Sequence, residues 1–217
     1  MDALNTSLFL WLNASSNPSA GVLAFAKLFA DYAIGLVPAV LVMGWLRAGE
    51  LTRKHLLLAT VAGLAALLVN QVIGLVWQHP RPFMIGLGHT YIPHAADSSF
   101  PSDHLTLLWA VAFSLLPYRT TRRVALALTL LGIPMAWARI YLGVHFPMDM
   151  LGAALVALLS AVVCSRGAPG FIDPVYRLVY ATYRPLFASF EPVTFPLSTK
   201  ETRKYESGYE EIDGIVD

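Results

Sequence analysis

The sequence predicts an all-α protein: a polytopic membrane helical bundle of about five spans, preceded by an N-terminal helix at the membrane interface. Hydrophobic residues make up 56% of the 217 residues and charged residues only 13%, whereas a soluble domain has about 25% charged residues. The apolar residues gather in long runs, as membrane-spanning helices require. The net charge of +1 argues neither for nor against a nucleic-acid partner, but the sequence shows no basic stripe with interleaved aromatic residues, and no nucleic-acid partner is expected.

The N-terminal stretch Ala3–Asn13 predicts a short amphipathic helix at the membrane surface, because it lacks the basic start and cleavage site of a secretory signal. Five apolar segments follow it: Ala20–Leu46, His55–Trp77, Leu105–Pro117, Val124–Ile140 and Pro147–Cys164. A spanning helix needs about 20 residues. The third segment therefore spans the membrane only if its helix begins near Ser102, and the alternative is a re-entrant half-helix.

Lysine and arginine residues set the predicted orientation. The loops on one side are basic and hold Arg47, Arg53, Lys54, Arg119, Arg122, Arg123 and Arg166. The opposite loops, Gln78–Pro101 and Tyr141–Phe146, are flanked only by Arg81 and Arg139 and are expected to face the exterior. We expect a membrane-embedded domain at residues 1–166 and a cytoplasmic tail at residues 167–217, first amphipathic and then disordered.

Polar residues that could carry chemistry converge on the exterior side. Each has a simple structural explanation by itself: an arginine can extend to the interface, a serine can cap a helix, and an aspartate favours a helix start. Together, at one depth of a chain with so few charges, they favour a functional site. They are Arg81, Ser102, His104, Arg139, His145 and Asp149.

These residue types suit the binding of a phosphate group. Arg81 and Arg139 offer planar sets of donors that match phosphate oxygens. Ser102 begins a helix, and the free N–H groups and dipole of a helix start favour an anion. We therefore expect these three residues to bind phosphate.

The two histidines add the means to transfer that phosphate. His145 precedes Asp149 by four residues, so a helix that starts near this point puts both on one face. Asp149 can then bond one imidazole nitrogen and leave the other free to attack phosphorus. His104 can protonate the leaving oxygen. No metal or cofactor is expected.

The spacing resembles the type-2 phosphatidic acid phosphatase superfamily, in particular its bacterial undecaprenyl-diphosphate phosphatase branch. The family pattern is Lys-x6-Arg-Pro, Pro-Ser-Gly-His and Ser-Arg-x5-His-x3-Asp, and the match runs from about residue 74 to 152. The resemblance implies a nucleophile, a general acid, an orienting carboxylate and three phosphate ligands. It implies that His145 is the nucleophile, His104 the general acid and Asp149 the orienting carboxylate. The phosphate ligands that it implies are Arg81, Ser102 and Arg139.

The sequence departs from the family pattern at Gly74, Asp103 and Ala138, where the family has lysine, glycine and serine. A carboxylate at Asp103 would repel phosphate, so it either points outward or pairs with an arginine. Other ionisable residues are weaker candidates. Lys27 and Asp31 form either a self-neutralising pair in the first span or a substrate-facing group, and His79, His94 and Asp97 flank the motifs.

The expected function is dephosphorylation of undecaprenyl diphosphate at the outer face of the bacterial inner membrane, through a phosphohistidine intermediate, to recycle the lipid carrier for cell-wall synthesis. A transferase that moves the phosphate to lipid A is the first alternative. A lipid-binding transporter is the second, although the chain has no repeat of the kind found in transporters. The expected partners are a polyprenyl diphosphate and the bilayer, and the oligomeric state stays open.

Overall fold

The computed structural model describes residues 2–187, with side chains described for residues 3–182. All regular structure in this part of the chain is helical, which confirms the predicted fold class. A π-helix (Leu28–Tyr32) and a 3₁₀ turn (Ala33–Gly35) join α2 to α3, and a second 3₁₀ turn covers Pro82–Ile85. The α-helices are α1 (Asp2–Leu12), α2 (Ala20–Lys27), α3 (Leu36–Arg47), α4 (Glu50–Val76), α5 (Asp103–Leu115), α6 (Arg122–Tyr141) and α7 (Pro147–Phe187).

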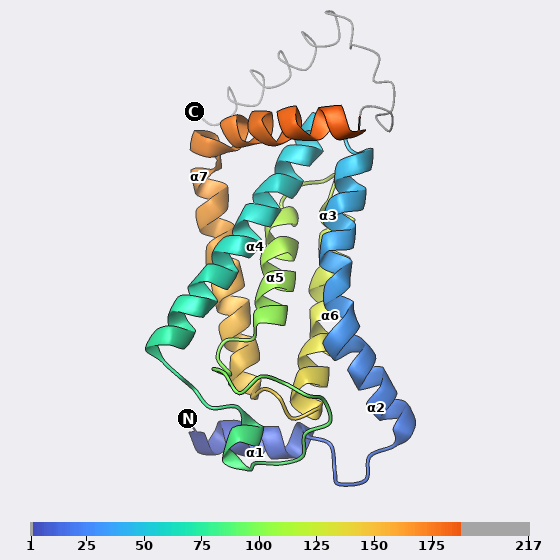
Figure 1. The fold of residues 1–217 in the computed structure, drawn as a ribbon, viewed down its shortest axis with the longest axis vertical. Helices are drawn as coiled ribbons and strands as arrows, with labels where there is room; N and C mark the ends of the chain where they lie inside the picture. The colour runs from blue at the N-terminus through green and yellow to red at the C-terminus, as the bar shows by residue number, and fades with distance from the viewer. Residues whose placement is uncertain (1, 188–217) are drawn as a thin grey trace, which may run out of the picture. The chain divides into compact units, whose positions relative to one another are not determined.

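The bundle is built from α2 to α7, with α1 lying across one end (Figure 1). From α3 to α7 successive helices run in opposite directions, so the turn at Ala48–Gly49 and the loop 116–121 share the other end. We call that end the basic end, because Arg47 and Arg122 flank these two connections. The loops 77–102 and 142–146 lie at the opposite end, which we call the site end.

Four described helical segments are long and apolar enough to cross a membrane: Ala20–Arg47, Glu50–Val76, Arg122–Tyr141 and Pro147–Thr182. The third predicted span does begin at Ser102, but its helix α5 has only 13 residues. The expectation that an early start would give α5 spanning length is therefore wrong. The sequence runs into Pro117 and a turn before the helix can lengthen further.

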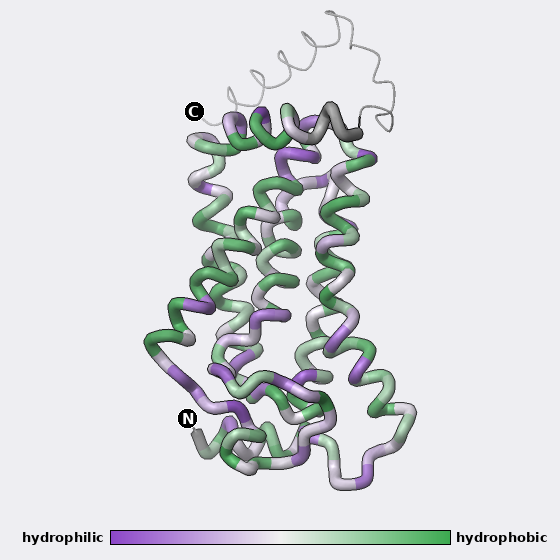
Figure 2. The backbone as a smooth tube through the Cα atoms, in the orientation of Figure 1, coloured by the Kyte–Doolittle hydropathy of each residue, from purple (hydrophilic) through white to green (hydrophobic). Residues whose placement is uncertain are grey.

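Helix α5 is instead the central helix of the bundle. Most of its side chains are buried, including Leu105, Leu108 and Leu115 at 0% exposure, and they belong to the main hydrophobic cluster. It packs against α4 and α6 (Figure 1). Figure 2 shows hydrophobic residues along the helices and hydrophilic ones gathered mostly near the two ends. The buried position of α5 holds its first residues in a fixed place at the site end.

Helix α1 agrees with the predicted interfacial helix in its bounds. Phe9 is fully buried and its ring lies 5.3 Å from that of Phe146, whereas Leu4 and Trp11 are exposed. Asn13, just after α1, bonds the carbonyl oxygens of His89 and Tyr141 at 2.9 and 3.0 Å. The N-terminal helix is thus fastened to the loops that carry the polar residues.

Helix α7 continues through the predicted boundary at residue 166. Beyond Arg166 it packs on the basic end, where Asp173 pairs with Lys54 at 2.8 Å and Tyr176 contacts Trp45. The chain divides into two compact units, Met1–Tyr180 and Ala181–Asp217. The disordered end predicted for the tail lies outside the described residues.

Candidate active site

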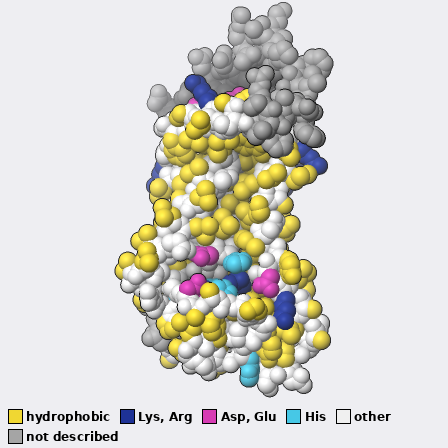
Figure 3. Space-filling model, viewed as in Figure 1, with side chains coloured by type: hydrophobic (Ala, Val, Ile, Leu, Met, Phe, Trp, Pro, Cys, Tyr) yellow, Lys and Arg dark blue, Asp and Glu magenta, His cyan; other side chains and the backbone are white. Residues whose placement is uncertain are grey.

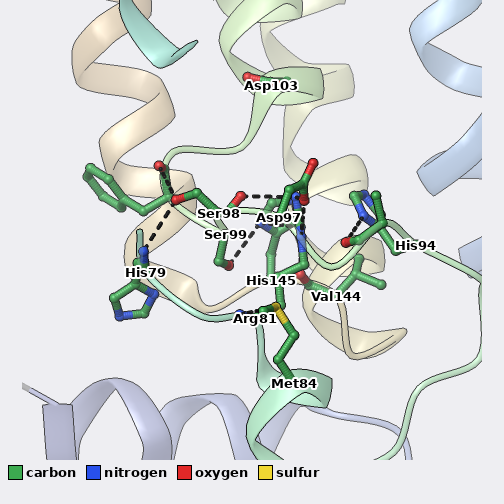
Figure 4. Close-up of polar contacts among 12 residues, drawn as sticks. His79, Arg81, Met84, His94, Asp97, Ser98, Ser99, Asp103, Val144 and His145 are labelled. Carbon is green, nitrogen blue, oxygen red and sulfur yellow. Dashed lines mark hydrogen bonds and ion pairs between the residues drawn. The ribbon is translucent and has the colours of Figure 1, made fainter. Parts of the chain in front are cut away.

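The centre of the site is His145, in the short connection between α6 and α7. Its Nε2 accepts from the guanidinium groups of Arg81 at 3.1 Å and Arg139 at 3.3 Å. All three side chains are buried, at 1 to 5% exposure. The structure therefore brings together three predicted residues that are up to 64 positions apart in the chain (Figure 4, which labels Arg81 and His145).

Asp149 holds the other nitrogen of His145. The Oδ2 atom of Asp149 lies 3.0 Å from Nδ1 of His145 and also accepts the backbone N–H of Phe146 at 2.8 Å. Helix α7 begins at Pro147, so His145 precedes the helix and does not share a helical face with Asp149 as expected. The contact arises because the chain folds back at the helix start. Because arginine can only donate, Nε2 is the unprotonated nitrogen and Nδ1–H donates to Asp149.

Arg81 is held on its far side by a carboxylate. Its Nε and Nη2 atoms both contact Oδ1 of Asp97 at 2.8 Å, and Nη2 also donates to the carbonyl oxygen of Ser98 at 3.2 Å. Nη1 donates to the carbonyl oxygen of Val144 at 3.0 Å and faces His145. Asp97 is thus a neighbour of the site that orients Arg81, while its own side chain is 62% exposed.

Arg139 is held without a carboxylate in contact, among the described residues. Nη1 donates to the carbonyl oxygen of Ala30 at 3.2 Å, and Nη2 lies 2.9 Å from Nε2 of His94. The rings of His94 and His145 meet edge to face, with centroids 6.0 Å apart. His94, a weaker candidate from the sequence, therefore belongs to the site.

The start of α5 places Ser102 and His104 beside these residues. Ser102 occupies the N-cap position but its hydroxyl does not cap the helix; Oγ is buried and has no hydrogen-bond partner among the described residues. A free buried hydroxyl at a helix N-terminus is suited to an incoming anion. His104 is half-buried and lies within electrostatic range of Arg139, His94 and Arg81.

The carboxylate of Asp103 points away from His145 and is bound by two amides of α4 (Figure 4). Nδ2 of Asn70 donates to Oδ1 at 2.8 Å, and Nε2 of Gln71 donates to Oδ2 at 3.3 Å. Of the two predicted alternatives, the outward direction is therefore correct, with amides rather than an arginine as partners. This arrangement keeps the carboxylate of Asp103 away from the position at which the sequence predicts a phosphate to bind.

Gly74 leaves space beside the site where the family pattern has lysine. A Cβ atom at this position would lie 3.4 Å from Cβ of Ser98, which is an ordinary contact. The space belongs to a cavity of about 450 Å³, which Gly74 lines together with Asn70, Gln71, Asp97, Ser98 and Asp103. The charged residues that line it are both carboxylates, so its walls supply no replacement for the missing ammonium group.

Ser99 is a buried residue of the site that sequence reasoning missed. It is 0% exposed, and its hydroxyl donates to Oδ2 of Asp149 and lies 3.4 Å from Nδ1 of His145. The signal was its place three residues before Ser102, in the same loop that carries the motif. Without the fold, nothing distinguished it from Ser98 beside it.

Three weaker candidates lie apart from the reactive atoms. The ring of His79 packs edge-on against Phe146 at 5.5 Å and is directed away from His145 (Figure 4). Lys27 and Asp31 form no ion pair in the described part of the chain, so the self-neutralising pair is not observed. The helix changes to a π-helix between them, which alters the spacing of the side chains.

Two histidines in the loops, His145 and His94, have lowered pKa values, which favours their neutral form. Burial, followed by the charge of Arg139 and then that of Arg81, lowers the pKa of His145 well below its usual range. Burial and then the charge of Arg81 also lower the pKa of His94. A neutral imidazole keeps a lone pair on Nε2, which a nucleophile requires.

The site opens on one face of the bundle. Figure 3 shows acidic, basic and histidine side chains gathered in a band there, with apolar surface on the side toward the basic end. Asp31, Asp97 and Asp103 are exposed, whereas Arg81 and Arg139 are buried. Among the described residues, no group of three or more potential metal ligands converges. The arrangement can bind an anionic group next to an apolar surface.

The chain is similar to known proteins over the region that carries the site. The family model of the PAP2 superfamily matches residues 54–172, which include every motif residue. Undecaprenyl-diphosphatase BcrC of Bacillus subtilis (strain 168) is 34% identical over 186 residues, 84% of this chain and 95% of that protein. Putative undecaprenyl-diphosphatase YbjG of Escherichia coli (strain K12) is 32% identical over 188 residues, 87% and 94% of the two chains.

More distant matches are a third sequence relative and two solved structures of similar fold. A Bacillus licheniformis protein named bacitracin transport permease protein BcrC is 26% identical over 167 residues, 76% of this chain and 81% of that protein. The crystal structure of Aquifex aeolicus LpxE matches with a TM-score of 0.58 at 22% identity, over 75% and 95% of the chains. A PAP2 type phosphatidylglycerolphosphate phosphatase from Bacillus subtilis matches with a TM-score of 0.55 at 17% identity, over 78% and 85%. As the motifs predicted, the chain belongs to the PAP2 superfamily.

Proposed function

We propose that the protein hydrolyses undecaprenyl diphosphate to undecaprenyl phosphate at the exterior face of the membrane, through a phosphohistidine intermediate. Membership of the PAP2 superfamily and two relatives named as undecaprenyl-diphosphatases support a lipid phosphatase of this substrate class. The observation that carries the mechanism is the position of His145 Nε2, an unprotonated nitrogen that faces Arg81 and Arg139. A phosphate bound by both arginines lies in front of this lone pair.

In the first step, Nε2 of His145 attacks the distal phosphorus of the diphosphate. The N–P bond forms as the bridging P–O bond breaks, and the electron pair leaves with the lipid monophosphate. Asp149 stabilises the imidazolium through Nδ1–H. Arg81, Arg139 and the start of α5 stabilise the charge on the transferred group.

In the second step, water attacks the phosphorus of the phosphohistidine. The O–P bond forms, the N–P bond breaks, and inorganic phosphate leaves while His145 regains its lone pair. His104 is placed to supply a proton to the leaving oxygen in the first step and to accept one from water in the second. The observation behind this assignment is the place of His104 in the first turn of α5, two residues after Ser102.

The orientation of the bundle supports a reaction at the exterior. The basic end carries Arg47, Arg119, Arg122 and Arg123, and the positive-inside rule directs such loops to the cytoplasm. The site lies at the opposite end. In a Gram-negative bacterium the proposed reaction would then occur at the periplasmic face of the inner membrane.

Phosphate release by the purified full-length protein is the test of this function. Undecaprenyl diphosphate labelled with ³²P in its distal phosphate is supplied in detergent micelles, with and without lipid A. We expect release of labelled inorganic phosphate in both cases and, after rapid quenching in alkali, labelled protein that is absent in His145→Ala. A phosphoramidate survives alkali and is lost in acid, which identifies the bond.

The other outcomes separate the alternative functions. Transfer of the label to lipid A, with no release in its absence, would establish the transferase. Binding of the lipid without release of phosphate under any condition would favour a transporter, and one relative is named as a transport permease. Release without any labelled histidine would leave a phosphatase but remove the covalent mechanism.

A further inference from the structure

The first span contains an interruption at the depth of the site. Helix α2 ends at Lys27, a π-helix covers Leu28–Tyr32, and a 3₁₀ turn covers Ala33–Gly35 before α3 begins. Figure 1 shows the change of direction between α2 and α3. A π-helix is rare and interrupts the regular ladder of backbone hydrogen bonds, and it is often found at functional sites. This interruption lies outside residues 54–172, which the family model matches.

Small residues let this part of the first span approach α6 closely. Ala26, Ala30 and Ala138 are each 0% exposed and pack in one cluster. Alanine at such positions allows two helix backbones to come together. The carbonyl oxygen of Ala30, within the π-helix, consequently reaches Nη1 of Arg139 at 3.2 Å. Ala138, at the position where the family pattern has serine, is thus one of the small residues at this contact.

The partners of the two arginines differ in charge. Arg81 is fixed by the carboxylate of Asp97, which offsets its positive charge. Arg139 is fixed by a neutral carbonyl at Ala30 and by the imidazole of His94. Asp31, the next residue of the π-helix, is exposed and acts on Arg139 only at longer range. Arg139 therefore keeps more of its charge for an incoming phosphate.

We propose that the π-helical turn Leu28–Tyr32 is a positioning element of the phosphate site, which orients Arg139 through the carbonyl oxygen of Ala30. The first span is then part of the active site and not only a membrane anchor. This inference rests on the proposed function in that Arg139 must bind the phosphate of the substrate. It extends that function by assigning a role to a segment beyond the motifs.

The test measures how strongly inorganic phosphate inhibits the full-length enzyme. Ala30→Val adds bulk at a fully buried contact and separates the π-helix from α6, so the bond to Arg139 is lost. We expect the inhibition constant for phosphate and KM for the lipid to rise about tenfold, the effect of losing a hydrogen bond to a charged group. Ala30→Gly keeps the close approach and should remain within about twofold of the wild type.

Two controls separate positioning from a general loss of structure. Ala24→Val makes the same change at an exposed position of α2 and should leave the phosphate inhibition constant unchanged. In an Arg139→Lys background, Ala30→Val should add little further effect, because residues that act through one another are not additive. A folded Ala30→Val protein with wild-type phosphate inhibition would overturn the proposal, as would an equal effect of Ala30→Val in the Arg139→Lys background.

If Ala30→Val does not fold, a backbone substitution provides the same test. Lactic acid in place of Asp31 turns the Ala30 carbonyl into an ester, a weaker acceptor, and Asp31→Ala is its matched reference. Weaker phosphate binding in the ester protein supports the proposal, and equal binding rejects it. A wild type that releases no phosphate from the lipid would reject the proposed function. If the wild type is inactive, phosphate binding by the variants is compared through the shift in unfolding temperature that inorganic phosphate causes.

Discussion

The carboxylate of Asp149 lies 3.0 Å from Nδ1 of His145, and each of the two residues is only 1% exposed. At this position Asp149 selects the tautomer in which Nε2 carries the lone pair, and Nε2 faces the two arginines. The same carboxylate accepts the hydroxyl of Ser99 and the N–H of Phe146. The orientation of the imidazole is thus determined by a network and not by one contact.

Replacement of the nucleophile and of its partner should have graded effects. His145→Ala should abolish turnover, because it removes the nitrogen that attacks phosphorus. Asp149→Asn should lower kcat by about 10³–10⁴-fold, since the amide cannot stabilise the imidazolium. Ser99→Ala removes one of three contacts to Asp149 and should cost about tenfold. The measurement is kcat in purified, folded variants, and substantial turnover by His145→Ala would contradict the covalent mechanism.

The role of His104 depends on the leaving group. A diphosphate expels a phosphate monoester, whose second pKa is about 6, so it departs readily near neutral pH. A lipid monophosphate must expel an alkoxide, which requires a proton. General acid catalysis contributes about 10²–10⁴-fold. His104→Ala should therefore reduce kcat/KM far more for a prenyl monophosphate than for undecaprenyl diphosphate, and equal losses would mean that His104 only binds phosphate.

Asp103 should stabilise the fold through its amide partners on α4. Asp103→Ala and Asn70→Ala each remove a hydrogen bond to a charged group, and each should lower the free energy of unfolding by about 1–2 kcal/mol. In the double variant the loss should be smaller than the sum of the two single losses, because both single variants remove the same hydrogen bond between Asn70 and Asp103. Thermal unfolding of the four proteins in one detergent provides the comparison. Additive losses would show that the contact contributes nothing.

The pH profile should reflect the lowered pKa of His145. Burial and the charge of Arg139 hold this pKa well below the usual value of about 6.5. The imidazole therefore stays neutral at pH values somewhat below 6.5. The acid limb of kcat/KM, which reports the free enzyme, should accordingly lie below pH 6.5. Arg139→Gln removes a positive charge and should move the limb to higher pH. Ionisation of the substrate contributes equally to both profiles. Acid limbs that coincide in the wild type and in Arg139→Gln would therefore contradict an effect of Arg139 on the pKa of His145.

Topology can be tested by reporter fusions at the two ends of the bundle. A reporter fused after Arg119 lies in the connection between α5 and α6 and should behave as cytoplasmic. A reporter fused after Gly88, in the loop that carries Arg81, should behave as exterior. The physical reason is the excess of arginine at the basic end. The reverse pattern would reject a reaction at the outer face.

The sequence predicted those parts of the site in which short spacing determines geometry. His145 and Asp149 lie four residues apart around a helix start, and Ser102 directly precedes α5, so their neighbourhoods followed from local rules. Ala30 lies 109 residues from its partner Arg139, and Asn70 lies 33 residues from Asp103. Such contacts depend on how helices pack, and no local pattern marks them. The length of α5 was misjudged for a similar reason, because a buried central helix need not meet the length of a lipid-exposed span.

The shortness of α5 has a consequence for where the substrate must go. Thirteen residues of helix rise about 20 Å, whereas the hydrocarbon layer is about 30 Å thick. The length of α5 is thus about 10 Å less than the thickness of that layer, and we expect Ser102 and His104, at its site-end start, to lie beneath the layer's surface. A headgroup that reaches them leaves bulk hydration, and the arginines and the helix start take the place of that water. We expect a lipid to offset this dehydration through its anchored tail, an advantage that a soluble phosphate ester lacks, so that the depth of the site would favour a lipid substrate.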